Sequence, residues 1–257
     1  MEIKDSQIMI TGASRGIGFA FAKVCAENKA HLHLVVRNSD EQLSKDLMAA
    51  GAASVTLWQA DLANKKSVED LVHQITTLNI DILFNNAGML TGGLLEEQSQ
   101  EEIDSMLQVN VASLIQLTRA LLPRMLQRKN GKIINNASVA ALMHFPMAST
   151  YSASKAAVLA FTRCLEIELE GTGVSTLLLI TPGIKTRMFD EIEIRYGKNI
   201  KVPNLSISPY KFAGMIKEAV LNDMRVLEPH GLTAFGLNVA KYLPKSFAWV
   251  VRSRFKR

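Results

Sequence analysis

The feature that most constrains this chain is a glycine-rich loop that joins a short apolar run to a helical pattern. The loop, Thr11-Gly12-Ala13-Ser14-Arg15-Gly16-Ile17-Gly18, directly follows a predicted strand at residues 7–10. We expect Gly12 to permit a sharp turn, Gly16 to let the backbone approach a pyrophosphate, and Gly18 to let the helix pack closely on a sheet. Free amides at a helix N-terminus attract phosphate groups. A plain strand–helix turn does not need three glycines at these places, so the loop predicts a site for a dinucleotide.

The rest of the chain alternates short β-branched runs with helical patterns, in which apolar residues recur every three or four positions. Repeated strand–helix–strand units with right-handed crossovers build a parallel sheet covered on both faces. No internal repeat or linker interrupts the 257 residues. We therefore predict an α/β fold, a single Rossmann domain over residues 1–257, with a doubly wound parallel sheet of about seven strands and helices on both faces. Six of the strands are expected at residues 7–10, 32–36, 54–58, 80–84, 132–135 and 174–180.

Several further motifs stand at the ends of these predicted strands. Asn85-Asn86-Ala87-Gly88 follows the fourth strand, Asp61 ends the third, and Ser138, Tyr151-Ser-Ala-Ser-Lys155 and Pro182-Gly183 follow in order. Together with the spacing Thr-Gly-x-x-x-Gly-x-Gly, they resemble the short-chain dehydrogenase/reductase family over about residues 5–190. The resemblance implies an oxidoreductase that moves a hydride between a nicotinamide cofactor and a carbonyl or secondary alcohol.

The same resemblance implies which residues contact the cofactor. Asp61 matches the position at the adenine, while backbone amides after the sixth strand and the Thr186 hydroxyl would hold the carboxamide. The full set of implied cofactor contacts is Gly12, Ser14, Arg15, Gly16, Ile17, Gly18, Arg37, Asp61, Leu62, Asn86, Ala87, Gly88, Tyr151, Lys155, Pro182, Gly183, Ile184 and Thr186.

The end of the second strand bears on the choice of cofactor. An acid there would hydrogen-bond the adenosine 2′-hydroxyl and repel a 2′-phosphate, but the sequence Leu34-Val35-Val36-Arg37-Asn38 has none. Arg37 could pair with a phosphate, and Arg15 could approach it from the glycine loop. Either arginine alone is better explained as a solvated surface residue. Both together, with the acid missing, predict NADP(H).

Tyr151 and Lys155 are four residues apart in a predicted helix, so their side chains share one face. The reference pKa of tyrosine is about 10, and a neighbouring cation favours the phenolate. The resemblance implies that Tyr151 is the acid/base and that Lys155 also holds the nicotinamide ribose. It implies that Ser138 polarises the substrate carbonyl and that Asn110 holds a water in the proton relay. A Tyr-x-x-x-Lys pair alone is commonplace, and Asn110 alone could be a polar residue at a helix kink; the four together predict catalysis.

Residues on the substrate side are apolar. Periodicity degrades from about Arg187 to Asn204, which predicts a substrate lobe at about residues 187–207, with a surface excursion of no function as the alternative. A methionine-lined pocket favours a hydrophobic ketone or alcohol, although several of its residues could equally pack in the core. The candidates are residues 139–143 and 145–147, Met188 and Phe189.

The net charge of +5 is concentrated in a basic C-terminal tail, residues 241–257, which holds six Lys or Arg and no acid. Without these six, 23 basic residues stand against 24 acidic ones, so no nucleic-acid surface is expected. The tail also carries Trp249 and other apolar residues, which leaves three interpretations open: peripheral contact with an anionic membrane, cover for a neighbouring subunit, or a frayed end.

The expected compartment is the cytoplasm, with surface association to a membrane left open. No signal peptide is recognised, and no apolar run approaches the ~20 residues of a membrane span. Cys25 and Cys164 are expected to be buried free thiols. His31 and His33 alternate along a strand without ligand partners, so no metal is expected.

Two alternatives to the reductase interpretation remain at this stage. One is an NADP(H)-binding regulator with little turnover, although such a protein would usually have lost the Tyr or the Lys. The other is epimerisation or dehydration on the same scaffold. The resemblance also implies a homodimer or homotetramer formed through the helices that hold Asn110 and Lys155, and a small-molecule substrate.

Overall fold

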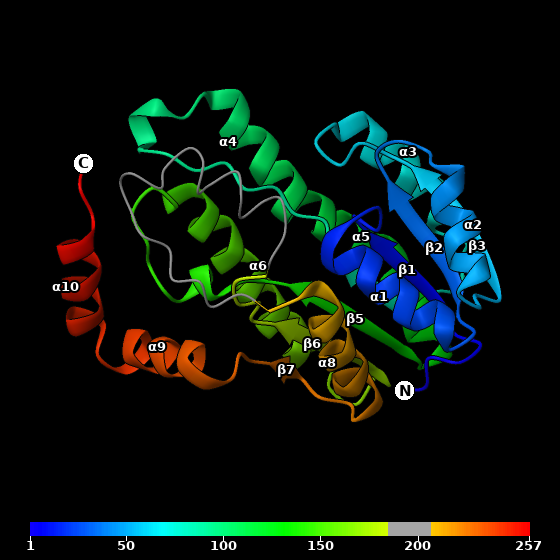
Figure 1. Ribbon diagram of the computed structural model, residues 1–257. Helices are drawn as coiled ribbons and strands as arrows, with labels where there is room; N and C mark the ends of the chain where they lie inside the picture. The colour runs from blue at the N-terminus through cyan, green and yellow to red at the C-terminus, as the bar shows by residue number, and fades with distance from the viewer. Residues whose placement is uncertain (185–206) are drawn as a thin grey trace.

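The computed structural model describes residues 1–184 and 207–257 (Figure 1). Within them, seven strands form one sheet in the order β3-β2-β1-β4-β5-β6-β7, and every neighbouring pair is parallel. This is the predicted doubly wound Rossmann fold. The strands are β1 Gln7–Thr11, β2 His31–Val36, β3 Ser54–Gln59, β4 Ile82–Asn85, β5 Gly131–Asn136, β6 Val174–Leu179 and β7 Val226–Leu227.

The six strands expected from the sequence are confirmed, with shifted ends. The fourth begins at Ile82 rather than residue 80, and the carboxylate of Asp81, directly before it, accepts a hydrogen bond from the Gln7 amide (2.9 Å). The seventh strand, β7, has only two residues, which is too short to leave a periodic pattern in the sequence.

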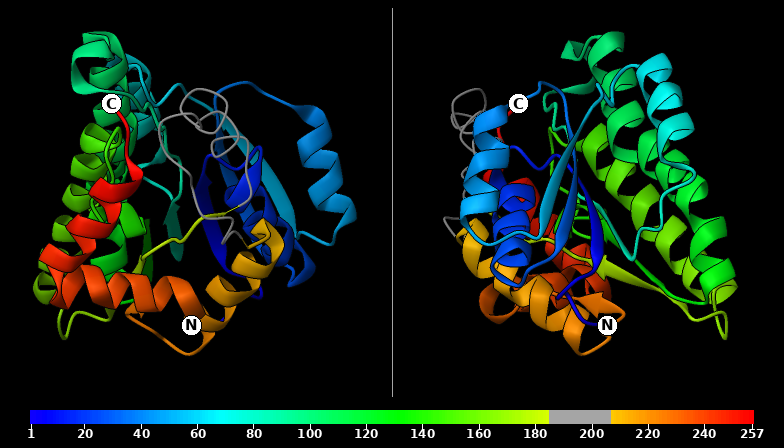
Figure 2. Two further views of the ribbon diagram at one scale, coloured as in Figure 1. Left: turned by 60° about the vertical axis from the view of Figure 1, so that its left-hand side comes forward. Right: turned by 90° about the vertical axis from the view of Figure 1, so that its right-hand side faces the viewer.

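Helices cover both faces of the sheet (Figure 2). Alternate strand residues explain this: Ile8 and Ile10 pack in a core with α1, α2 and α8, whereas Met9 points into a second core with α3, α5 and α6. The helices are α1 Gly16–Glu27, α2 Glu41–Ala49, α3 Lys65–Ile75, α4 Gln100–Leu107, α5 Ser113–Arg128, α6 Ser149–Glu168, α8 Pro209–Leu221, α9 Gly231–Tyr242 and α10 Pro244–Arg254.

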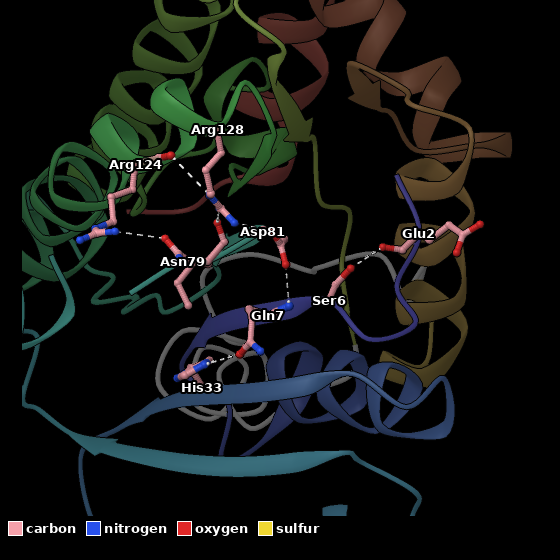
Figure 3. A network of polar contacts seen from close by, with 9 residues as sticks. Glu2, Ser6, Gln7, His33, Asn79, Asp81, Arg124 and Arg128 are labelled. Atoms are coloured by element: carbon pink, nitrogen blue, oxygen red, sulfur yellow. Dashed lines mark hydrogen bonds and ion pairs between the residues drawn. The ribbon is translucent and has the colours of Figure 1, made fainter. Parts of the chain in front are cut away.

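The amino edge of the sheet is held by structural polar contacts (Figure 3). The Asp81 carboxylate accepts from the Gln7 amide and from Arg128 Nη1 at the end of α5 (2.9 Å each). Trp58 Nε1 donates to His33 Nδ1 (3.2 Å), so Nε2 of His33 carries the hydrogen that is donated to Gln7 Oε1 (2.9 Å). Burial lowers the pKa of His33, which keeps this ring neutral. His33 is therefore a structural residue.

Three further observations concern the tail, the thiols and the membrane. The last helix begins at Pro244, and α9 and α10 lie at the outer edge of the fold beyond β7 (Figure 1).

Cys25 is buried, but Cys164 is exposed, so the prediction of two buried thiols was wrong for Cys164, whose side chain lies on the outer face of α6. In the described parts of the chain, none of the helices has the length and apolar character that crossing a bilayer requires.

Candidate active site

The glycine loop lies at the carboxyl edge of the sheet, where the strand order reverses between β1 and β4. Gly12 and Gly16 have φ of 66° and 62°, a region that favours glycine. A Cβ on Gly18 would lie 2.3 Å from the carbonyl oxygen of Gly12 and 2.6 Å from Asn86 Nδ2. Gly18 is thus required by the loop's own backbone as well as by helix packing. These three positions keep side chains out of a cradle that fits the phosphates of a dinucleotide at the N-terminus of α1.

The ends of β1 and β4 are joined by Thr11 and Asn86. Thr11 Oγ1 accepts hydrogen bonds from the amides of Asn86 (3.0 Å) and Ala87 (2.9 Å). Asn86 Nδ2 in turn donates to the carbonyl oxygens of Thr11 (3.0 Å) and Gly12 (3.3 Å). The Asn-Asn-Ala-Gly segment therefore shapes the glycine loop. Thr11 was missing from the predicted site, although its place at the head of the loop was a signal.

The residues predicted to select the cofactor lie at the ends of the neighbouring strands. The Gly12 amide donates to the Val35 carbonyl oxygen (3.1 Å), which joins the loop to the end of β2, two residues before Arg37. Arg15 and Arg37 are both exposed, as is Ser14, and Ile17 is half-buried. Asp61 follows β3, is exposed, and accepts from the Ala63 amide (3.0 Å), while the adjacent Leu62 is buried. No acid stands directly after β2.

The Tyr151 side chain sits beside Ser138. Ser138 lies two residues after the end of β5 and caps the short 3-10 helix Val139–Ala141, where its Oγ accepts from the Ala140 amide (3.1 Å). It also hydrogen-bonds the Tyr151 hydroxyl. Burial raises the pKa of Tyr151 to about 12, and the Ser138 hydrogen bond opposes this only in part. The sequence predicted a phenolate favoured by Lys155; instead, burial dominates and the hydroxyl keeps its proton at neutral pH.

Lys155 is buried on the same face of α6, with Nζ 5.8 Å from the centroid of the Tyr151 ring. Its ammonium donates to the carbonyl oxygen of Asn136 (2.8 Å), and burial lowers its pKa to about 8. Gly88 lies beside this ammonium: a Cβ built on it would be 3.5 Å from Lys155 Nζ, an ordinary contact distance.

Asn136 was not predicted and holds several site residues together. Besides its contact with Lys155, its Nδ2 donates to Asn86 Oδ1 (3.2 Å) and its Oδ1 accepts from Thr181 Oγ1. The signal in the sequence was its position as the last residue of a strand, where the polar side chains of this site gather.

Asn110 lies in a π-helical turn, Gln108–Ala112, between α4 and α5. Its Oδ1 accepts from the Met89 amide and its Nδ2 donates to the Met89 carbonyl oxygen (2.8 Å each) and to Ser154 Oγ (3.0 Å). The Asn110 side chain is therefore engaged by protein groups, in a π-helical turn of the kind often found at functional sites.

The segment after β6 is described only in part. Pro182 and Gly183 are half-buried, and the Gly183 carbonyl oxygen accepts from the Ile207 amide (3.2 Å). Ile184 is buried and bridges Ile207. Thr186, Met188, Phe189 and the predicted lobe, apart from Ile207, lie outside the described residues.

The apolar residues after Ser138 are divided between core and surface. Val139, Leu142 and Met143 pack against a core cluster that contains Leu237 of α9, as the core alternative expected. The Phe145 ring contacts Phe247 of α10 edge to face, with centroids 5.9 Å apart. Among the described residues, no three His, Cys, Asp or Glu side chains are clustered as a metal site requires.

Comparisons with known proteins agree with this geometry. The family model of the short chain dehydrogenases matches residues 6–196. The ketoacyl reductase HetN of Nostoc sp. is 32% identical over 221 residues, which are 84% of this chain and 75% of that protein.

Two solved structures show the same fold with different cofactors. A short-chain dehydrogenase from Sphingobium yanoikuyae in complex with NADPH has a TM-score of 0.80 at 26% identity, covering 98% of this chain and 96% of that one. A short chain dehydrogenase/reductase from Burkholderia phymatum in complex with NAD has a TM-score of 0.80 at 28% identity, covering 93% and 94%.

Proposed function

The chain belongs to the short-chain dehydrogenase family, oxidoreductases that use a nicotinamide cofactor, and from this premise we propose an NADP(H)-dependent reductase of a hydrophobic carbonyl compound. The observation that carries the proposal is the position of Tyr151, hydrogen-bonded to Ser138 with the Lys155 ammonium 5.8 Å from its ring. The reverse oxidation of a secondary alcohol uses the same groups.

When bound, the nicotinamide supplies the hydride in reduction or accepts it in oxidation. The Tyr151 hydroxyl is protonated at neutral pH and donates its proton to the substrate oxygen as the carbonyl is reduced. The Ser138 hydroxyl orients Tyr151 and hydrogen-bonds the same oxygen. The Lys155 ammonium stabilises the tyrosinate that is left, holds the ribose hydroxyls, and passes on a proton through a water held at Asn110.

We assign the cofactor to the carboxyl edge of β1 to β6. The amides at Ser14, Gly16 and Ile17 would hold the phosphates, and Asp61 with Leu62 the adenine. Ala87 and Gly88 would contact the nucleoside, and residues 182–184 with Thr186 the carboxamide. The preference for NADP(H) is supported by Arg15 and Arg37, both exposed beside the loop, and by the absence of an acid after β2.

Three finer points complete the proposal. A hydrophobic substrate is supported by the relative named a ketoacyl reductase; the lobe at about 187–207 would cover it. A homodimer or homotetramer through α5 and α6 is supported by apolar side chains on them, with Ile167 74% exposed. A reducing cytoplasm suits the exposed thiol of Cys164.

The test is oxidation of NADPH against a panel of ketones, aldehydes and 3-oxoacyl thioesters. We expect turnover with at least one apolar carbonyl compound, and a loss of about 10²–10⁴-fold in kcat for Tyr151→Phe with cofactor binding retained. Tyr210→Phe, which alters an exposed tyrosine on α8, is the matched control and should keep full activity. Tight NADPH binding without turnover on the whole panel would indicate the regulator instead, and undiminished turnover of Tyr151→Phe would overturn the mechanism.

A further inference from the structure

The C-terminal helices expose large apolar side chains that the proposed reaction does not use. On α9, Leu232, Phe235 and Tyr242 are 71%, 69% and 78% exposed, and their spacing of three and seven residues places them on one stripe of the helix. On α10, Trp249 is 71% exposed. Solvated side chains of this size on two consecutive helices indicate a surface that contacts something else.

The charge around these apolar residues is of one sign. The last acidic residue is Glu228, and six cations follow it. Lys241 and Arg257 form ion pairs with Glu228 and Glu96. Lys245, Arg252 and Arg254 are exposed, and within the described residues they form no ion pair.

The geometry of α10 combines both properties on one face. Lys245 lies four residues before Trp249 and Arg252 lies three residues after it, so the indole is flanked by two cations on the same side of the helix. Phe247 points the other way, where its ring contacts Phe145, and this contact holds α10 on the body of the protein. The Trp249 face is thus presented outward by an anchored helix.

We propose that this C-terminal surface, formed by Leu232, Phe235 and Tyr242 of α9 and by Lys245, Trp249 and Arg252 of α10, docks the protein on the surface of an anionic lipid bilayer. Tryptophan and tyrosine are suited to the interface of a bilayer, and lysine and arginine beside them pair with anionic headgroups. No helix inserts; the contact is peripheral.

A second copy of the chain is disfavoured as the occupant. A two-fold symmetric contact would place each cationic patch against the same patch on the partner, and like charges in such a contact are repulsive. The acidic segment at residues 96–104 offers a local counterpart, but its Glu96 is already paired with Arg257 of the same chain. An anionic bilayer, by contrast, complements both the cations and the apolar stripe.

The experiment measures binding of the full-length protein to vesicles of phosphatidylcholine with phosphatidylglycerol, and of phosphatidylcholine alone, by co-sedimentation. We expect binding to the anionic vesicles, weakened by salt, and little to the neutral ones. The triple variant Lys245→Gln, Arg252→Gln, Arg254→Gln should bind about a hundredfold more weakly. The matched control, Lys4→Gln, Lys65→Gln, Lys211→Gln, removes three exposed charges elsewhere and should bind like the parent.

Trp249 also reports its own environment. The chain has two tryptophans, so the Trp58→Phe variant leaves Trp249 as the sole indole. Its emission should shift to the blue on adding anionic vesicles and be quenched by brominated lipids, if the indole enters the interface. Equal binding of the triple variant and its control, or unchanged Trp249 emission, would overturn the proposal. Without vesicles, a smaller sedimentation coefficient of a Trp249→Ala variant than of the parent would assign the surface to a second copy instead, which also overturns the proposal.

Discussion

The Lys155 ammonium donates a hydrogen bond to the backbone carbonyl oxygen of Asn136, with 2.8 Å between Nζ and oxygen. This contact joins the middle of α6 to the end of β5. Asn136 also contacts Asn86 at the end of β4, and Thr181 past the end of β6. The position of the buried lysine is therefore set by three strand ends, which is why the pair Tyr151 and Lys155 depends on the whole sheet edge.

The pH dependence of reduction should report Lys155. Burial lowers its pKa to about 8, so the ammonium that assists proton delivery is present below that pH and is lost as the pH rises through it. The value of kcat/KM for NADPH, which reports the free enzyme, should be level near pH 6–7 (about one unit or more below that pKa) and fall above about 8. Lys155→Arg, which stays charged, should move any remaining decline to higher pH. A reduction rate that increases through pH 8 would contradict this assignment.

Gly18→Ala should damage the glycine loop. Its Cβ would meet the Gly12 carbonyl oxygen at 2.3 Å, and because that atom is backbone, the loop must shift. We expect the free energy of unfolding to fall by about 1–3 kcal/mol and NADPH binding to weaken. Chemical denaturation and fluorescence titration measure the two effects. Gly214→Ala on α8 is the control, because its Cβ has nothing within 4 Å and should stabilise by about 0.5–1 kcal/mol.

Arg37→Ala should reduce the preference for NADPH over NADH. A charge-assisted hydrogen bond to the 2′-phosphate contributes about 1.5–3 kcal/mol, so Kd for NADPH should rise about 10–100-fold while Kd for NADH is unchanged. Isothermal titration with both cofactors gives the ratio. Arg225→Ala, an exposed arginine before β7, should leave both affinities as they were. An unchanged ratio in Arg37→Ala would remove this arginine from the cofactor site.

Asp223→Asn should destabilise the fold without touching the site. The Lys132 side chain is fully buried on β5, and its Nζ lies 2.6 Å from Asp223 Oδ1. Asparagine tolerates the φ of 50° at this position but removes the charge, which leaves a buried cation without its counter-ion. We expect a loss of about 1–3 kcal/mol in the free energy of unfolding. This is less than for a fully buried ion pair, because Asp223 is half exposed.

The pH dependence of the free energy of unfolding gives a second measurement of this ion pair. Lys132 lowers the pKa of Asp223, so the pair's contribution is present at neutral pH and disappears as the pH falls through that lowered pKa. The control is Asp70→Asn, which removes the acid of an exposed helix pair with Lys66 and should lower the free energy of unfolding far less. Equal losses in the free energy of unfolding for Asp223→Asn and Asp70→Asn would show that the burial of Lys132 does not strengthen its ion pair.

The local order of this protein was readable from its sequence. A strand is recognised by its pattern of apolar residues, and the turn after the first strand by its three glycines. Both are local features, because residues close together in the sequence determine periodicity and backbone conformation. The fold class, six strands and the glycine loop were predicted on that basis. Tyr151 and Lys155 were predicted to share a face because a helix places residues four apart together.

Only the tertiary structure decided how residues distant in the sequence act on one another. Asn136 meets Lys155 and Asn86 because parallel strands end at one edge, and nothing near Asn136 in the sequence specifies those partners. The Tyr151 pKa rises rather than falls because burial by the surrounding fold outweighs its local contacts, and burial is a property of the packed chain. The sequence therefore determined which groups carry the chemistry, whereas packing determined their protonation, their partners and the outward face of α10.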